Sequence, residues 1–221
     1  DHAMDIGAIA NRSSASILGS ESTANIARGY GVPEDQIVVV ESGAPYEFGD
    51  FVVTLIPSAH APIGLRGEVP LPGTIDEPLD LPAPITAWRE GGSYSIVISH
   101  PQGTTLVQGS AGYREGALDA VQTDVVMLGV GLLESLGRDY AERYWQALVT
   151  STGAKRVFPV HFDDQTRPFG EIELPPTLID NFVRTARWLQ DIRGTWDKDT
   201  QIYLPVFGAP LVLYPEQTPD A

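Results

Sequence analysis

The amino-acid sequence predicts a layered α/β protein made of a single domain. Its 221 residues are enough for a substantial core, and a hydrophobic content of 43% with 19% charged residues is ordinary for a globular chain. Runs rich in β-branched residues, bounded by turn residues, alternate with stretches whose apolar residues recur at helical spacing. Strands interleaved with helices in this way are typical of layered α/β folds.

The predicted strands follow one another along most of the chain. Two of them flank His100-Pro101-Gln102-Gly103, whose residue types predict a β-hairpin turn. We therefore take His100 as a surface residue. The strands are expected at residues 36–41, 51–57, 94–99, 104–108, 124–130, 156–162 and 202–214.

Three stretches predict helices. Residues 20–30 end near Gly29 and Gly31, and residues 139–150 place apolar side chains at four-residue spacing. The third helix is expected to begin at Thr177, an N-cap type of residue, and to end at Gly194. Its predicted apolar face consists of Leu178, Phe182, Ala186 and Leu189.

Residues 62–90 form a proline-rich segment in which regular structure is not expected. Several aliphatic residues lie between the prolines, which is too apolar for a solvated linker. A loop of this length inside a compact domain is usually functional or disordered. It begins two residues after His60, so it is either a lid or substrate wall, or an arm packed on its own domain or on a neighbouring subunit of a homo-oligomer.

The composition argues against several classes of protein. A net charge of −15, from 14 basic and 29 acidic residues, disfavours DNA, RNA and anionic membrane surfaces as partners. With no cysteine, thiolate metal ligands and disulfides are excluded. No apolar run approaches the roughly 20 residues of a membrane span. An anchor or signal peptide ahead of Asp1 is compatible with this sequence. Cytoplasmic and exported locations both remain compatible with the sequence.

Three of the four histidines have the placement of metal ligands. His60 and His161 each follow a predicted strand, and His2 stands beside Asp1 at the start of the chain. Loops at one edge of a β-scaffold often carry such sites. Two histidines and a carboxylate, Asp1, His2 and His161, suit zinc, and manganese or ferrous iron are also chemically acceptable. Asp163 and Asp164 are candidates for a supporting or substitute role beside His161, or for a turn.

These histidines lie in motifs that resemble the metallo-β-lactamase superfamily. Asp1-His2-Ala3-Met4-Asp5 is similar to the second half of its His-x-His-x-Asp-His signature, and residues 7–10 and 17–20 resemble the helix and short strand that follow it. Pro57-Ser58-Ala59-His60 and Pro159-Val160-His161-Phe162 match later ligand motifs. The similarity spans nearly the whole chain, and Asp163-Asp164 with Arg167-Pro168 also resembles bacterial members. The nearest branch is that of L-ascorbate-6-phosphate lactonase-like and N-acylphosphatidylethanolamine phospholipase D-like hydrolases.

The resemblance implies a fold and a set of roles. The fold is a four-layer αβ/βα sandwich, incomplete at the N-terminus because the family places strands and a His-x-His ahead of Asp1. Asp1, His2 and His161 would hold a second metal ion, and His60 would be one ligand of a first. Asp1 would also orient the attacking water.

Ser110 departs from the family pattern. Gly109-Ser110-Ala111-Gly112-Tyr113 falls where the family has Gly-Asp-Thr-Gly-Tyr, in which the aspartate bridges two metal ions. Serine is a poor replacement for a charged bridging ligand, so we expect weaker binding at one site. One or two zinc ions remain compatible with this sequence.

The sequence thus predicts a metal-dependent hydrolase. A metal-bound hydroxide would attack an ester, a lactone or a phosphodiester, and a small-molecule or lipid-like substrate is expected because the 62–90 segment is aliphatic. The alternative is a degenerate, non-catalytic member that uses the fold for binding, as Ser110 suggests. A redox role for an iron-loaded site ranks last.

Overall fold

The largest element of the computed structural model is a mixed seven-stranded sheet. The structure describes residues 2–168 and 170–214. Neighbouring strands are antiparallel from β3 to β6 and parallel from β6 to β9. In spatial order the strands are β3 (Pro45–Phe48), β4 (Phe51–Pro57), β5 (Tyr94–His100), β6 (Gly103–Gln108), β7 (Val125–Gly129), β8 (Arg156–Val160) and β9 (Gln201–Ile202).

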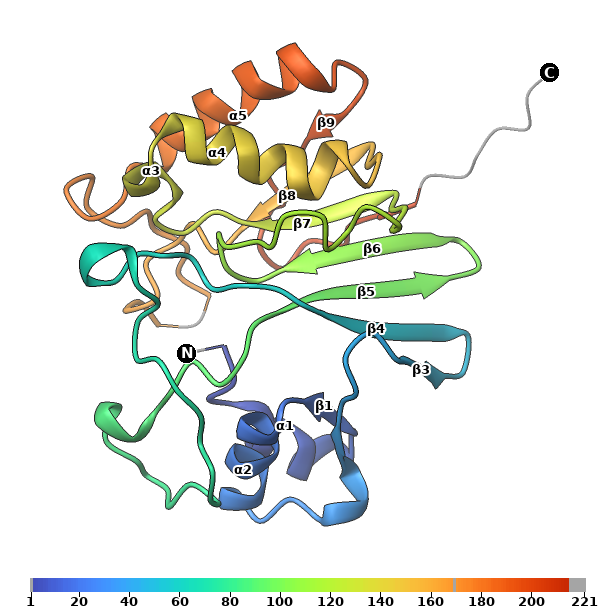
Figure 1. Cartoon of the computed structure of the whole chain (residues 1–221), viewed down its shortest axis with the longest axis vertical. Helices are drawn as coiled ribbons and strands as arrows, with labels where there is room; N and C mark the ends of the chain where they lie inside the picture. The colour runs from blue at the N-terminus through green and yellow to red at the C-terminus, as the bar shows by residue number, and fades with distance from the viewer. Residues whose placement is uncertain (1, 169, 215–221) are drawn as a thin grey trace.

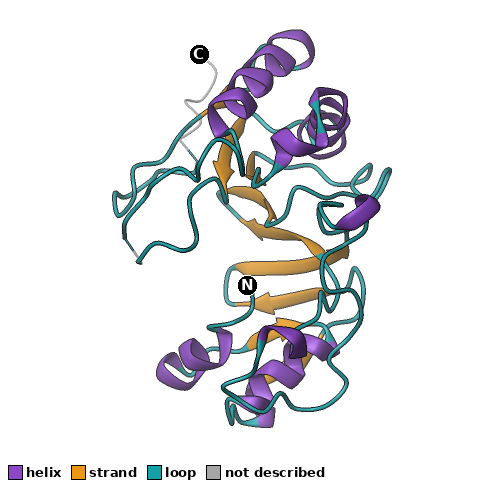
Figure 2. Ribbon diagram, turned by 90° about the vertical axis from the view of Figure 1, so that its left-hand side faces the viewer, coloured by secondary structure: helices purple, strands orange, loops and turns teal. Residues whose placement is uncertain are grey.

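Helices lie at both ends of the long axis of the molecule, and the seven-stranded sheet lies between them (Figures 1 and 2). At one end are α3 (Leu133–Leu136), α4 (Arg138–Trp145), which continues as a π-helical turn (Gln146–Thr150), and α5 (Phe182–Trp196). At the other end are α1 (Ile6–Ser13), α2 (Glu21–Gly29) and a parallel pair, β1 (Ile17–Gly19) and β2 (Ile37–Val39). The predicted α/β fold class is confirmed. None of the helices described is long and apolar enough to cross a membrane.

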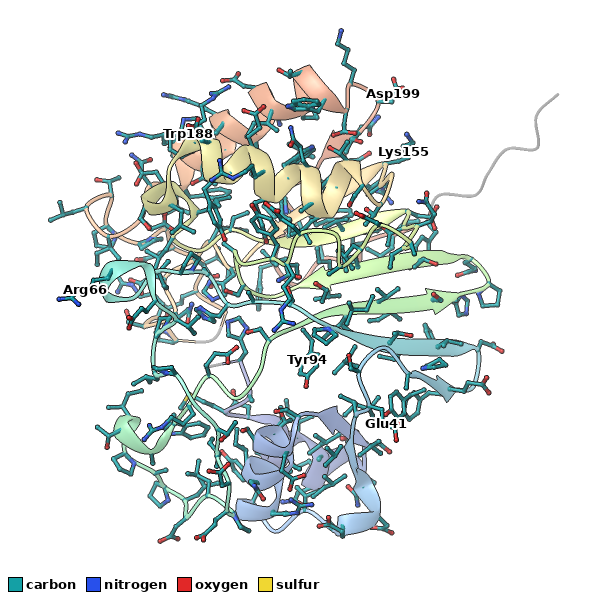
Figure 3. All side chains as sticks on the ribbon, in the orientation of Figure 1. Glu41, Arg66, Tyr94, Lys155, Trp188 and Asp199 are labelled. Atoms are coloured by element: carbon teal, nitrogen blue, oxygen red, sulfur yellow. The ribbon has the colours of Figure 1, made fainter. Side chains whose placement is uncertain are left out.

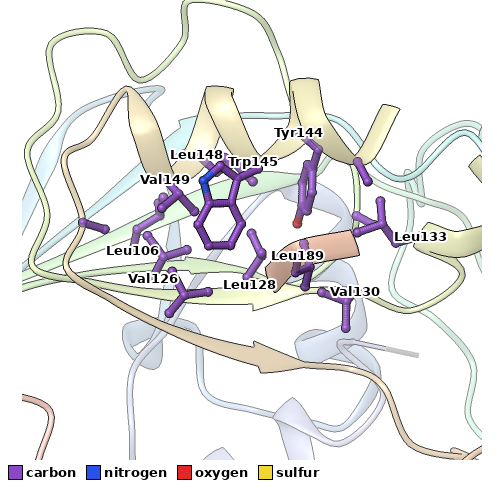
Figure 4. Packing of buried hydrophobic residues seen from close by; sticks show 14 of the residues in the cluster. Leu106, Val126, Leu128, Val130, Leu133, Tyr144, Trp145, Leu148, Val149 and Leu189 are labelled. Carbon is purple, nitrogen blue, oxygen red and sulfur yellow. The ribbon is translucent and has the colours of Figure 1, made fainter. Parts of the chain in front are cut away.

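The main core lies between the sheet and helices α4 and α5. Val97, Leu106 and Val126 occupy successive positions in the strand register, so their side chains share one face of the sheet. Against this face pack Trp145 and Tyr144 of α4, both fully buried (Figure 4). Burying each large apolar side chain contributes about 1.5–3 kcal/mol, so this layer is a major source of stability. It also fixes the strand ends that carry the site.

Two predicted segments differ from the structure, and the first is the start of the last helix. Helix α5 begins after Asn181, whose side-chain Oδ1 accepts a hydrogen bond from Arg184 N at 3.1 Å. Asn181 is therefore the N-cap in place of Thr177. Leu178, which was predicted on the apolar face, lies in the preceding turn and is 98% exposed. The turn is closed by Ile179 N and Asp180 N, which both donate to Pro176 O.

The second difference is the predicted strand at 202–214, which was wrong beyond Ile202. Only Gln201 and Ile202 pair with β8. Pro205 and Pro210 follow, and because proline has no N–H to donate, each of them removes a possible ladder hydrogen bond and disfavours a longer strand. Residues 203–214 instead run back over the sheet, where the Tyr214 hydroxyl lies 2.5 Å from Thr105 Oγ1.

The proline-rich segment is fastened to helix α2 through hydrogen bonds and a small apolar cluster. Ser22 Oγ accepts from Ile75 N at 2.9 Å, and Asn25 Nδ2 donates to Ile75 O at 2.8 Å. Leu79 N donates to Asn25 O at 3.0 Å. Ile75 and Leu79 are buried against Ile26, so this part of the segment is an arm on its own chain. As predicted, it contains no strand or α-helix, only 3-10 turns at Leu65–Gly67 and Ile85–Ala87.

Candidate metal centre

The candidate site lies at one edge of the sheet, where several strands end. Because β6, β7 and β8 are parallel neighbours, their carboxyl ends meet at the same edge. Pro57, at the end of β4, pairs with Tyr94 at the start of β5 and therefore reaches this edge too. His60 and His161 follow the ends of β4 and β8. His100 pairs with Gly103 at the opposite end of the sheet, where the predicted hairpin is found.

A pocket of about 130 Å³ opens between these loops. Sites for drug-sized ligands are larger, about 300–1,000 Å³, so this pocket admits a reacting group rather than a whole large substrate. Its apolar wall comes from loop residues that follow the strand ends, and its polar groups are two imidazoles, a hydroxyl and an amide. The lining residues are His60, Ala61, Ile63, Ser110, Ala111, Gly131, Leu132, His161 and Gln165.

His2 lies beside His161, although the two residues come from distant parts of the chain. Their ring centroids are 5.0 Å apart and the ring planes make an angle of 32°. Two imidazoles bound tetrahedrally to one zinc ion, with Zn–N about 2.1 Å, would place their centroids about 5 Å apart. The spacing of this pair is therefore compatible with a shared metal ion.

Two glycines make room for these rings. A Cβ atom placed on Gly131 would lie 2.4 Å from His161 Nδ1, and one on Gly109 would lie 3.3 Å from His2 Nδ1. His161 itself has a φ of 59°, a left-handed conformation that is uncommon outside glycine and that turns the chain sharply after β8. The backbone thus holds the two rings close to the strand ends.

The tautomer of His60 follows from one contact. Its Nδ1 lies 2.8 Å from Ala61 O, and a carbonyl oxygen can only accept a hydrogen bond. Nδ1 therefore carries the proton, which leaves the lone pair of Nε2 available for a metal ion or a substrate proton. Ser110 holds the same loop, because its hydroxyl accepts a hydrogen bond from Ala61 N at 2.9 Å.

His2 is held in its neutral form at neutral pH. Partial burial lowers the pKa of His2 to about 4, and the neighbouring His161 and His60 act in the same direction. A neutral imidazole is the form that binds metals. In donor chemistry the described histidines therefore fit a zinc-type ion.

The ligand set predicted from the sequence lies only partly within the described residues. Among residues 2–168 and 170–214, no group of three or more His, Cys, Asp or Glu is arranged to hold a metal ion. Asp1 lies outside the described residues. Asp164 is engaged in a turn, where its Oδ1 accepts from Thr166 N at 3.0 Å and from Thr166 Oγ1 at 2.7 Å. Asp163 is not among the residues that line the pocket.

The structure adds Gln165, which we did not predict from the sequence. Its Nε2 lies 3.1 Å from Nε2 and 3.2 Å from Nδ1 of His161, and its side chain lines the pocket. The available signal was its place next to Asp164, a turn-forming residue, four positions after a strand-end histidine.

Below the pocket, Tyr144 joins two of the strand ends. Its hydroxyl is 2.8 Å from Gly129 O and 3.2 Å from Ser110 O. One buried phenol therefore contacts both the end of β7 and the loop after β6. Full burial raises the pKa of Tyr144, so the hydroxyl keeps its proton and acts as the donor. This contact ties the site to the main core.

Comparisons with known proteins give similarities of structure only. No protein-family model and no curated protein matches the sequence. The metallo-β-lactamase-fold protein YhfI from Bacillus subtilis aligns over 93% of this chain and 70% of its own, with a TM-score of 0.49 and 13% identity. A protein from Parabacteroides distasonis described as a metal-dependent hydrolase aligns over 87% and 64%, with a TM-score of 0.46 and 11% identity.

A third similar structure is Tm1679, a metal-dependent hydrolase of the β-lactamase superfamily. It aligns over 81% of this chain and 59% of its own, with a TM-score of 0.40 and 18% identity. The chain thus spans 59–70% of the length of these three proteins. At such identities the similarity concerns the arrangement of the backbone, and these similar structures are metallo-β-lactamase-fold proteins and metal-dependent hydrolases.

Proposed function

We propose that this chain is a metal-dependent hydrolase that acts on an ester, a lactone or a phosphodiester. One observation carries the proposal: His2 and His161, from distant parts of the sequence, lie side by side at a spacing that suits a shared metal ion. His60 lines the same pocket as His161. Metal sites draw their imidazole ligands from separate segments in this way.

The proposed ligands are His2, His161 and His60. Asp1, outside the described residues, is proposed as a further ligand and as the acceptor that orients water. A bound zinc ion, or manganese or iron in its place, would acidify water and polarise a carbonyl or phosphoryl oxygen. The resemblance to lactonase-like and phospholipase D-like hydrolases supports this choice of reaction.

The chain's own residues set the conditions for hydrolysis. The Ala61 carbonyl keeps the proton of His60 on Nδ1, so that Nε2 remains an acceptor. Ala61, Ala111 and Leu132 supply an apolar wall that limits water beside the reacting group. Because the pocket is small, the rest of the substrate would lie outside it. We propose a small-molecule or lipid-like substrate, and we disfavour nucleic acid because of the net charge of −15.

The proposal is tested by metal analysis of the purified protein, with His161→Ala as the variant. The expected result is one or two bound ions per chain and a loss of at least tenfold in metal affinity in the variant. His100→Ala is the matched control, because this histidine lies at the opposite end of the sheet, and its metal content should equal that of the parent. A screen with 4-nitrophenyl acetate and bis(4-nitrophenyl) phosphate then tests for ester and phosphodiester hydrolysis.

A second candidate is a non-catalytic binding protein. Two observations favour it. Among the described residues no group of three metal ligands is assembled. Ser110 stands where the family that the sequence resembles has a bridging aspartate. The Ser110 hydroxyl is already engaged as an acceptor for Ala61 N. Failure of the purified protein to bind metal, even on titration with zinc and manganese, would reject the hydrolase and favour this candidate.

A further inference from the structure

The pocket contains one polar side chain that the proposed metal site does not use. Of its four polar lining residues, His161 and His60 are proposed ligands, and Ser110 holds the backbone of Ala61. The fourth is Gln165, an exposed residue of the loop after β8. Its amide can donate two hydrogen bonds and carries no charge.

The contact between Gln165 and His161 leaves the amide available. Gln165 Nε2 is nearly equidistant from the two ring nitrogens, at 3.1 and 3.2 Å. The lone pair of a ring nitrogen points outward in the plane of the ring, away from the other nitrogen. A single N–H of the amide can therefore be aligned with at most one of the two nitrogens. The second N–H of the amide stays available for another acceptor.

The backbone around Gln165 is anchored on both sides. The Asp164 carboxylate accepts two hydrogen bonds from Thr166, and these contacts lower the pKa of Asp164. Asp164 N donates to Glu173 O at 2.8 Å, and the Arg167 guanidinium pairs with the Glu173 carboxylate at 2.6 Å. The turn thus presents the Gln165 side chain to the pocket from a fixed position.

We propose that Gln165 contacts the substrate, with its amide N–H donating to the carbonyl or phosphoryl oxygen of the reacting group. This role rests on the proposed hydrolase function. Negative charge develops on that oxygen in the transition state, and a fixed donor beside it stabilises the charge. Gln165 is the one uncharged side-chain amide among the residues that line the described pocket.

The test compares Gln165→Glu with the parent. Glutamate has nearly the shape of glutamine, but when ionised it can only accept hydrogen bonds, so it removes the donor and repels an anion. With bis(4-nitrophenyl) phosphate as substrate and zinc-loaded protein, we expect kcat to fall by about 10²–10³-fold, a loss typical for one oxyanion donor. Gln102→Glu, in the hairpin at the opposite end of the sheet, is the control and should leave kcat unchanged.

A second readout does not depend on activity. Binding of inorganic phosphate, measured by calorimetry, should weaken at least tenfold in Gln165→Glu and remain unchanged in Gln102→Glu, while the metal content of both equals that of the parent. Equal phosphate affinity and kcat within twofold of the parent would overturn the role of Gln165 alone. A parent that binds no metal would overturn the hydrolase proposal instead. A parent that binds metal but binds no phosphate and hydrolyses neither 4-nitrophenyl acetate nor bis(4-nitrophenyl) phosphate would overturn both.

Discussion

At the scale of single residues, the carboxylate of Asp180 connects the turn before helix α5 to the wall of the pocket. Asp180 is only 6% exposed, and its Oδ2 accepts a hydrogen bond from Leu132 N at 2.8 Å. Leu132 has a φ of 59°, so this hydrogen bond holds a left-handed residue beside the site. Burial raises the pKa of Asp180 above its usual value of 3.8, which shows that the ionised form is disfavoured in the fold.

Two substitutions at Asp180 distinguish what its hydrogen bond contributes to the free energy of unfolding from what its charge contributes. Asp180→Ala leaves Leu132 N without its partner and should lower the free energy of unfolding by about 1–3 kcal/mol. Asp180→Asn keeps an acceptor and removes the charge, so at pH 7 it should be as stable as the parent or slightly more stable. Urea denaturation measures both.

The pH dependence of stability shows whether the Asp180 charge favours or opposes folding. Folded Asp180 binds its proton at a higher pH than unfolded Asp180, so its ionisation costs stability above the raised pKa, and this cost disappears as the pH falls towards 3.8. The advantage of Asp180→Asn over the parent should therefore shrink on acidification. An advantage that stayed constant from pH 7 to pH 4 would contradict this assignment.

Glycine substitutions test how closely the backbone surrounds the histidines. In Gly131→Ala the new Cβ would lie 2.4 Å from His161 Nδ1, so the ring must move, and we expect at least tenfold weaker metal binding. Gly194→Ala in helix α5 is the control, since no atom lies within 4 Å of the added Cβ. Because alanine favours the helix, this control should gain about 0.5–1 kcal/mol in thermal or urea unfolding and bind metal normally. Unchanged metal affinity in Gly131→Ala would show that His161 is not a ligand.

At the scale of elements, the proline-rich segment depends on helix α2. Asn25 is buried and bonds the segment through its side chain and its carbonyl oxygen. Asn25→Ala should lower the free energy of unfolding by about 1–3 kcal/mol and speed proteolytic cleavage within residues 68–90. Ile85→Ala lies in the same segment but is 71% exposed, and should change stability by no more than about 0.5 kcal/mol. Equal cleavage rates in both variants and the parent would mean that the segment moves independently of α2.

Elements with a strong local pattern could be predicted from the sequence. The runs at β4, β5 and β6 and the hairpin between the last two were predicted correctly, because their residue types favour one local structure. The start of α5 was missed because Thr177 and Asn181 are both good N-caps, and the Pro176 turn decides between them. The segment after Ile202 was missed because its many apolar residues favour a strand, whereas its two prolines disfavour one.

The site was predictable only in part. His60 and His161 could be placed because each follows a strand, and the parallel order of β6 to β8 brings such ends together. The roles of Gln165, Asp180 and Tyr144 could not be predicted, because each depends on a partner that local sequence does not identify. Asp180 and Leu132 are 48 residues apart, for example. Whether Asp1 joins the site remains a prediction.

At the scale of the whole molecule, the net charge of −15 should make stability depend on salt. Ion pairs between exposed side chains, such as Arg138 with Asp191, contribute little to stability. Repulsion among the excess carboxylates then has the greater effect on stability, and salt screens it. We expect Tm to rise by a few degrees between 10 and 300 mM NaCl, measured by circular dichroism. A fall in Tm would mean that the ion pairs dominate. Figure 3 shows charged side chains in loops at the surface, with Lys155 just before β8, Asp199 between α5 and β9, and Arg66 pointing away from the sheet.

The segment at residues 203–214 has a consequence for the order of folding. Its contacts join Tyr214 to Thr105 and the Arg156 guanidinium to the carbonyl oxygens of Val212 and Leu213, across 109, 56 and 57 residues of chain. Contacts of such long range are costly to close early, and these need the finished sheet as their template. We therefore expect the segment to dock after the rate-limiting barrier, so that weakening it should speed unfolding while leaving the rate of folding nearly unchanged. On this account, the last part of the described chain slows the unfolding of the sheet and has little influence on how fast the sheet forms.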